Sequence, residues 1–218
     1  MRQNKQSHYA APDTARRTRR RAPRVMAAIA GMAVLHGCAA LGATEDPPDT
    51  YNLVAPAEVT AGPVRRGAQI LVAEPVAVQA LDSENIVVET APFTIQYLGE
   101  SQWSDRLTGL VQRRLAESFD RSGRFSGVGL PGQGLAIDYQ IVTNIRSFGI
   151  DIPRGAAEVE IEVKLLDDRT GVIRDDRTFA AAVPVSRSAA PPDQYVRALN
   201  AAFTEVAADI VAWVADLI

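Results

Sequence analysis

Cys38 is the only cysteine of the chain, and its neighbours fit one specific covalent chemistry. Leu35 stands three residues before it, and Gly37 stands directly before it. An aliphatic residue, a small residue and then a cysteine in this spacing resemble a bacterial lipobox, although His36 departs from the usual occupant of its position. At such a site the thiol receives a diacylglycerol and the chain is cut before the cysteine. The sequence therefore predicts lipidation of Cys38, with Leu35 and Gly37 recognised by the signal peptidase.

The segment before Cys38 has the composition of an export signal. Residues 1–24 carry eight basic residues and one acid, and an apolar run over residues 25–35 follows. At about 11 residues, this run is shorter than the roughly 20 that a bilayer-spanning helix needs. A basic region followed by a short apolar region is typical of a signal peptide. We expect residues 1–37 to be removed, and the alternative is an ordinary secretory signal in which the cysteine is a coincidence.

Removal of the leader changes the charge of the chain. The leader holds 8 of the 23 basic residues and 1 of the 26 acids, which leaves 15 basic and 25 acidic residues and a net charge near −10. A surface of this sign repels nucleic acid and anionic lipid headgroups. We therefore expect no nucleic-acid partner, and we expect the acyl chains on Cys38 to anchor the protein to the membrane.

The mature chain lacks the residue types on which most catalytic sites depend. Both histidines, His8 and His36, lie in the leader, and Lys164 is the only lysine that follows it. The Ser-His-Asp and Cys-His arrangements and the usual zinc ligands are therefore excluded. Carboxylate-only chemistry and Ser-Lys pairs remain open. We expect a protein that is not an enzyme, with no catalytic residues, cofactor or metal.

Two patterns resemble ligand sites but are better explained by the fold. Residues 127–132 match G-x-G-x-x-G, but a dinucleotide site needs a strand before this motif and a helix after it. Here the expected order is reversed, so we predict a loop. Glu158, Glu160 and Glu162 alternate along a predicted strand at a spacing of about 7 Å. We expect these three acids to form a solvated face and not a cation site.

Two helices are predicted from apolar residues that recur at three- and four-residue spacing. The first covers residues 107–119, with Ser101 or Ser104 as its cap and Ser122-Gly123 as its end. The second opens at residues 191–193 and carries one apolar stripe, formed by Tyr195, Leu199, Phe203, Val206, Ile210, Trp213 and Leu217. We assign this stripe to the core.

Strands are predicted where the period changes to two. They cover residues 70–78, with an edge or bulge at Pro75, a hairpin over 86–88 and 93–98, a long strand over 135–148, and a pair over 157–166 and 172–183. We expect an α+β fold: a single domain over residues 51–218, with an antiparallel or mixed β-sheet and two long helices packed on one face. Residues 38–50 would be the lipidated tether.

A series of short motifs follows Cys38 in a characteristic order. Its members are Tyr51-Asn52-Leu53, Leu81-Asp82, Ile95-Gln96-Tyr97, Trp103, Leu115, Phe119, Asp138-Tyr139, Phe148, Arg177, Phe179, Ala198-Leu199-Asn200 and Trp213. Each motif is weakly specific, and their order carries the weight. The chain is similar over residues 51–218 to the ABC-type transport auxiliary lipoprotein family, the lipoprotein component of paraquat-inducible and MCE-domain transport systems.

The resemblance implies an accessory role in lipid movement between the two membranes of a Gram-negative envelope. The implied partners are a periplasmic MCE-domain protein and the inner-membrane ABC transporter or permease subunits, and a homo-oligomeric ring is compatible with the resemblance. Ala39 after the cysteine favours the periplasmic face of the outer membrane over the inner membrane. The alternatives are a lipid-anchored envelope assembly factor for an outer-membrane protein and a carboxylate-dependent hydrolase.

Overall fold

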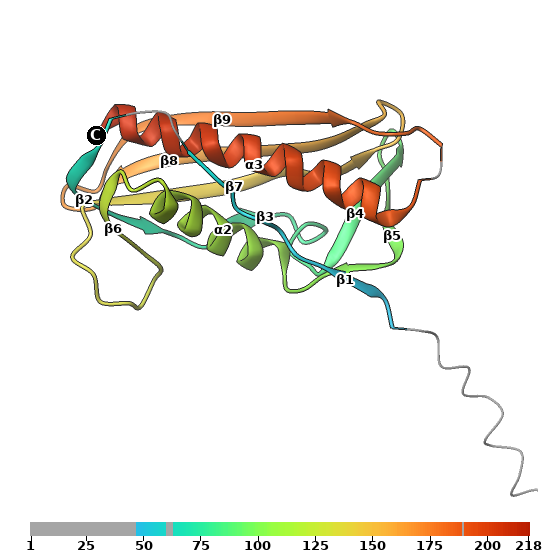
Figure 1. Cartoon of the computed structure of the whole chain (residues 1–218), viewed down its shortest axis with the longest axis horizontal. Helices are drawn as coiled ribbons and strands as arrows, with labels where there is room; N and C mark the ends of the chain where they lie inside the picture. The colour runs from blue at the N-terminus through green and yellow to red at the C-terminus, as the bar shows by residue number, and fades with distance from the viewer. Residues whose placement is uncertain (1–46, 60–62, 189) are drawn as a thin grey trace, which may run out of the picture. The chain divides into compact units, whose positions relative to one another are not determined.

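The structure is a computed structural model, and it describes residues 47–59, 63–188 and 190–218 (Figure 1). The signal peptide, the lipobox residues Leu35, Gly37 and Cys38, and the tether up to residue 46 lie outside the described residues. The described part contains β1 (Asp49–Tyr51), β2 (Arg65–Val72), β3 (Val76–Ala77), β4 (Asn85–Ala91), β5 (Thr94–Trp103), α2 (Leu107–Arg121), β6 (Phe125–Gly129), β7 (Tyr139–Asp151), β8 (Ala156–Asp167), β9 (Val172–Pro184) and α3 (Pro192–Leu217). Strand β1 thus begins inside the segment expected to be a tether.

The long strand β7 organises the sheet. On one side it pairs antiparallel with β8, which pairs antiparallel with β9. On its other side three shorter strands, β2, β3 and β4, pair parallel to it one after another along its length. Strand β6 continues the sheet beyond β2, and β5 and β1 continue it beyond β4. The result is a mixed sheet in a single domain with two described helices, which confirms the expected α+β class.

Strands β8 and β9 form the hairpin that the alternating sequence predicts. On β8 the apolar positions Val159, Ile161, Val163 and Leu165 are fully buried, and the charged positions between them are only partly buried. The two strands pair from Ala156 opposite Pro184 to Asp167 opposite Val172. Gly171 in the turn has a φ of +71°, a conformation that glycine adopts without steric cost.

Both helices pack on the same face of the sheet, as expected (Figure 1). Helix α3 contacts β7, β8 and β9, and α2 contacts β2 and β6. Between sheet and helix, the ring of Phe148 meets Trp103 edge-on at 5.9 Å and Phe203 at 6.1 Å. The predicted stripe of α3 is buried, with the exception of Leu217, which is 40% exposed because the helix ends there.

Helix α3 is long and apolar enough to cross a membrane by length and composition alone. However, 61% of its most apolar window is buried within the domain. This extent of burial is typical of the core helix of a folded domain.

The start of α2 differs from the prediction. Ser101 and Ser104 do not cap the helix; Ser101 lies in β5, and Arg106 stands at the N-cap without a side-chain cap hydrogen bond. Instead, the carboxylate of Asp82 accepts a 2.7 Å hydrogen bond from the Thr108 hydroxyl and a 2.9 Å hydrogen bond from the Arg106 guanidinium. A negative charge at a helix N-terminus is favourable because of the helix dipole. The stabilising group therefore comes from a distant loop.

Two strand assignments and one loop assignment also need correction. The strand expected over residues 70–78 is interrupted, because pairing with β7 by β2 ends at Val72 and resumes in β3 at Val76, on either side of Pro75. The strand expected from residue 135 begins at Tyr139. The first three residues of the G-x-G-x-x-G match lie in β6, which pairs with β2, and not in a loop. Along the described chain, the next element after β6 is the strand β7 and not a helix, so these residues do not have the strand–motif–helix order of a dinucleotide site.

Candidate functional site: an apolar groove beside an uncharged hairpin tip

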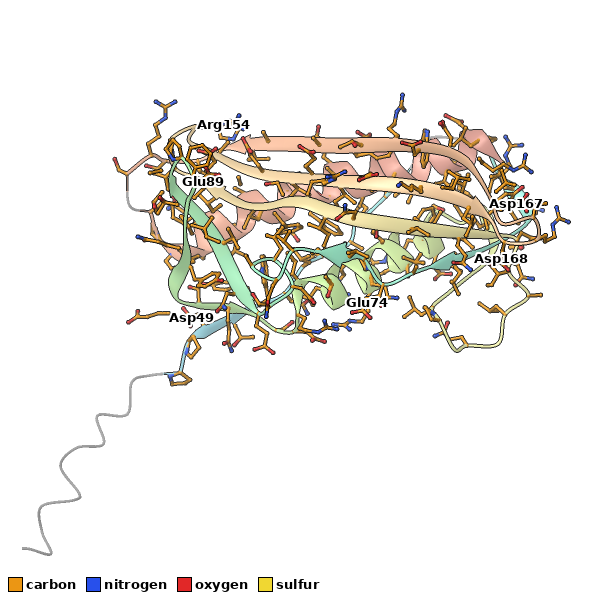
Figure 2. All side chains as sticks on the ribbon, turned by 180° about the vertical axis from the view of Figure 1, so that it is seen from behind. Asp49, Glu74, Glu89, Arg154, Asp167 and Asp168 are labelled. Atoms are coloured by element: carbon orange, nitrogen blue, oxygen red, sulfur yellow. The ribbon has the colours of Figure 1, made fainter. Side chains whose placement is uncertain are left out.

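The sheet face opposite the helices is uncovered among the described residues, as the view from behind shows (Figure 2). The side chains on this face change from charged to apolar across the sheet. Towards β8 it carries Glu158, Glu160, Glu162 and Lys164. Towards β4 and β5 it carries apolar residues and a groove with a volume of about 210 Å³.

The groove is built by parts of the chain that are distant in sequence. Its lining residues are Val78, Ala80 and Leu81 from the segment after β3, Val87 and Glu89 from β4, Ile95 from β5, residues 146–151 from β7, and Glu158 from β8. Apolar side chains line its floor, and charged side chains stand around them. Such a groove suits an apolar group of a partner molecule.

The charged rim of the groove is an ion-pair network around Arg154, in the turn between β7 and β8. Its guanidinium lies 2.9 Å from a carboxylate oxygen of Glu158 and 3.5 Å from one of Asp151. The hydrogen bond to Glu158, followed by the charges of Glu158 and Asp151, raises the pKa of Arg154. Glu89 lies at the same end of the sheet (Figure 2). Because Arg154 holds two of these carboxylates, we assign the network to positioning the turn and not to proton transfer.

Two of the three glutamates on β8, Glu158 and Glu162, are paired with cations. Glu162 accepts hydrogen bonds from Arg146, and the Lys164 ammonium lies 3.3 Å from it. The hydrogen bond from Arg146, then that from Lys164, lowers the pKa of Glu162. Within residues 47–59, 63–188 and 190–218, no group of three or more His, Cys, Asp or Glu side chains is placed to hold a metal ion. Figure 2 shows Asp167 and Asp168 at the other end of the sheet from Glu89.

Next to the groove, the tip of the β4–β5 hairpin exposes apolar side chains. Phe93 is fully exposed, and Ile95 and Tyr97 on the following strand are half exposed. Phe93 is predicted from the sequence to start a strand, but it lies in the two-residue turn between Ala91 and Thr94. A signal for this surface was present in the sequence, because residues 90–99 contain no charged side chain.

Several residues of the ordered motif series prove to be structural. The side-chain oxygen of Asn200 on α3 accepts a 2.7 Å hydrogen bond from the backbone N–H of Val54. Asp138 accepts a 3.0 Å hydrogen bond from the backbone N–H of Gln69. Phe179 and Trp213 pack edge-on at 5.5 Å. These contacts join the N-terminal segment, the sheet and α3.

The predicted lipidation site is not among the residues that form the surface described above. Cys38, Leu35 and Gly37 lie outside the described residues, so their lipidation and processing remain predictions. Four residues that line the groove, Leu81, Ile95, Phe148 and Glu158, belong to patterns noted in the sequence. Nothing in those patterns indicated that the four residues line one groove, because their proximity depends on pairing between distant strands.

Comparisons with known proteins identify relatives of the described domain. An uncharacterised protein of Bradyrhizobium diazoefficiens is 27% identical over 174 residues, which is 75% of this chain and 44% of the relative's own length. The chain thus spans less than half of that curated relative. Protein XCC0632 of Xanthomonas campestris, a DUF330 member, has a similar crystal structure: TM-score 0.66, 26% identity, 76% of this chain and 94% of that chain covered. A second crystal structure, of an uncharacterised protein, shares the fold, with a TM-score of 0.61, 16% identity, and coverage of 78% of this chain and 99% of that chain.

The family relationship covers most of the chain. The family model described as ABC-type transport auxiliary lipoprotein component matches residues 51–211. This range extends from the end of β1 into the last turns of α3, so it includes the whole groove and the β4–β5 hairpin. The chain belongs to the family of ABC-type transport auxiliary lipoprotein components.

Proposed function

We propose that this chain is a membrane-anchored periplasmic accessory lipoprotein of an ABC/MCE-type intermembrane lipid transport system. It acts without catalysis and holds the transport assembly at the outer membrane. The observation that carries this proposal is the family match over residues 51–211, since the family consists of auxiliary transport components. The pairing of Glu158 and Glu162 with arginines supports a non-catalytic role for the β8 acids.

We assign partner docking to the groove. The groove offers apolar contacts from Val78, Val87 and Ile95 beside the carboxylates of Glu89 and Asp151. The mature chain has a net charge near −10. A partner segment with apolar side chains and flanking basic residues would complement both features. The partner that we propose is the periplasmic MCE-domain protein, which in turn connects to the inner-membrane transporter or permease.

Affinity purification of the lipidated protein from membranes of its own cells tests the proposal. We expect the purified protein to bring down an MCE-domain protein and transporter subunits. The variant Ile95→Asp places a charge in the groove and should lose the partner. Ile173→Asp is a matched control, because Ile173 is 51% exposed on β9 and Ile95 is 50% exposed on β5. If both variants recover equal amounts of the partner, the groove is not the docking site.

The same purification distinguishes the main alternative. An envelope assembly factor would recover an outer-membrane β-barrel protein instead of transporter subunits, and that result would overturn the transport role. Mass measurement of the purified lipoprotein in detergent tests the proposed homo-oligomeric ring. A single monomer mass would exclude the ring and leave the docking role standing.

A further inference from the structure

The tip of the β4–β5 hairpin combines two features that the docking role does not use. Phe93 is fully exposed, and residues 90–99 carry no charge; beyond the tip, Tyr97 and the groove residue Ile95 extend the apolar surface down β5. We propose that this tip, led by Phe93, inserts into the lipid membrane to which Cys38 ties the chain. The proposal goes beyond the transport role and depends only on the lipid anchor predicted at Cys38.

The backbone of the turn holds Phe93 away from the domain. Pro92 and Phe93 are the two residues between the paired positions Ala91 and Thr94, and Phe93 has a φ of +66°. Proline at the first central position and a positive φ at the second are the features of a type II turn, in which the second position favours glycine. An aromatic residue there is unfavourable for the backbone, and its side chain does not pack in the core. Because folding does not explain Phe93, an external contact is the better explanation.

The chemistry of the tip suits lipid. Trp and Tyr are enriched at the boundary between headgroups and acyl chains, and Phe, like Trp and Leu, is found on the membrane-facing side of interfacial helices. Backbone N–H groups are costly in that region, and Pro92 has none. Charges also hinder insertion, and the nearest ones along the chain are Glu89 and Glu100, at the two ends of the uncharged run. With a net charge near −10, the mature chain would not be attracted to anionic lipid by charge, so the contact must be apolar and insensitive to salt.

The number of residues between Cys38 and β1 permits this contact. Asp49 stands 11 positions after Cys38, so the two Cα atoms are at most about 40 Å apart. Strand β1, which begins at Asp49, pairs with Ser101–Trp103 of β5, the strand that begins at the tip. Thr94 to Ser101 covers about 23 Å along a strand. The chain before Asp49 is therefore long enough for the acyl chains and Phe93 to reach one membrane together.

Tryptophan fluorescence of the full lipidated protein in vesicles tests the insertion. Phe93→Trp places a reporter at the tip, and Val172→Trp is the matched control, because Val172 is also an exposed apolar residue, in the β8–β9 turn region. The native Trp103 and Trp213 are buried, so their signal is subtracted with the parent protein. The vesicles contain phosphatidylethanolamine and phosphatidylglycerol, with or without lipids brominated on the acyl chains.

We expect brominated lipid to quench the tryptophan at position 93 at least twofold more than the one at position 172, with little change between low and high salt. Absence of quenching at position 93 would overturn the proposal. Equal quenching at both positions would also overturn it, because the domain would then lie on the membrane without a specific contact. A blue shift at position 93 that brominated lipid does not quench would indicate docking to protein, and would likewise overturn it. None of these results depends on recovery of an MCE-domain partner, so the two proposals fail separately.

Discussion

Gly149 on β7 lies so close to β4 that a Cβ atom on the glycine would stand 2.8 Å from the carbonyl oxygen of Val87. The Cβ of Val87 would be 3.3 Å away. A backbone oxygen cannot move aside as the end of a long side chain can. The close approach of these two strands therefore depends on glycine, and it shapes one wall of the groove, which both residues line.

Gly149→Ala should separate β4 from β7 and lower the free energy of unfolding by about 1–3 kcal/mol, the usual range for overpacking. Denaturant unfolding followed by fluorescence measures this change. Gly67→Ala on β2 is the control, because a Cβ there would meet no atom within 4 Å. A Gly149→Ala protein as stable as the Gly67→Ala protein would contradict the proposed role of the close approach.

Cys38→Ala should abolish acylation and leave the domain folded, because the buried core of the described residues begins at Leu53, well after Cys38 in the chain. Metabolic labelling with a fatty acid measures acylation, and circular dichroism checks the fold. If the variant still incorporates the labelled fatty acid, the predicted lipidation site is wrong.

The buried carboxylate of Asp167 should make stability depend on pH. Burial raises its pKa, but hydrogen bonds from Thr170 and the neighbouring Arg174 guanidinium outweigh burial, so the pKa lies below its ordinary value of 3.8. A lowered pKa means that the ionised group stabilises the fold above the unfolded-state pKa, and that this stability is lost as the pH falls through the folded-state pKa. Asp167→Asn should therefore lower the melting temperature at pH 7. The difference in melting temperature between this variant and the parent protein should become smaller below about pH 4.

Asp176→Asn is the control for this measurement, because Asp176 is exposed on β9 whereas Asp167 is 2% exposed. It should change the melting temperature little at either pH. A gap between Asp167→Asn and the parent that stays constant from pH 7 to pH 3 would show that the ionised carboxylate is not the stabilising group.

Phe93→Gly should make the domain more stable while it removes the aromatic tip. A positive φ costs a residue with a Cβ about 1–2 kcal/mol, and glycine loses about 0.5–1 kcal/mol through the entropy of the unfolded chain. We expect the free energy of unfolding to rise by about 0.5–1 kcal/mol in denaturant titration. Thr94→Gly, at the next position in β5, should instead lower it. A similar loss in both variants would mean that the turn does not strain Phe93.

The sequence by itself determined the helices and strands in which the spacing of apolar residues shows which side is buried. The alternation on β8 and the stripe on α3 predict their buried sides because each side chain's exposure follows from its position in the repeat. The pairing of β8 with β9 followed from their short turn. The fold class and the packing of both helices on one face of the sheet were also predictable, because each helix and strand has one apolar side that must be buried against the other layer.

Only the tertiary structure decided how distant segments meet. Asp82 supports the start of α2 from a loop 26 positions before Thr108, a relation that no local cap signal records. Val78, Ile95 and Gly149 line one groove because β3 and β4 pair parallel with β7 and β5 pairs antiparallel with β4. The register of these pairs depends on packing of the whole sheet. Local periodicity states which face of a strand is buried, but it does not state which strand lies beside it. The anchor site could be predicted from a few adjacent residues, whereas the groove required the complete fold.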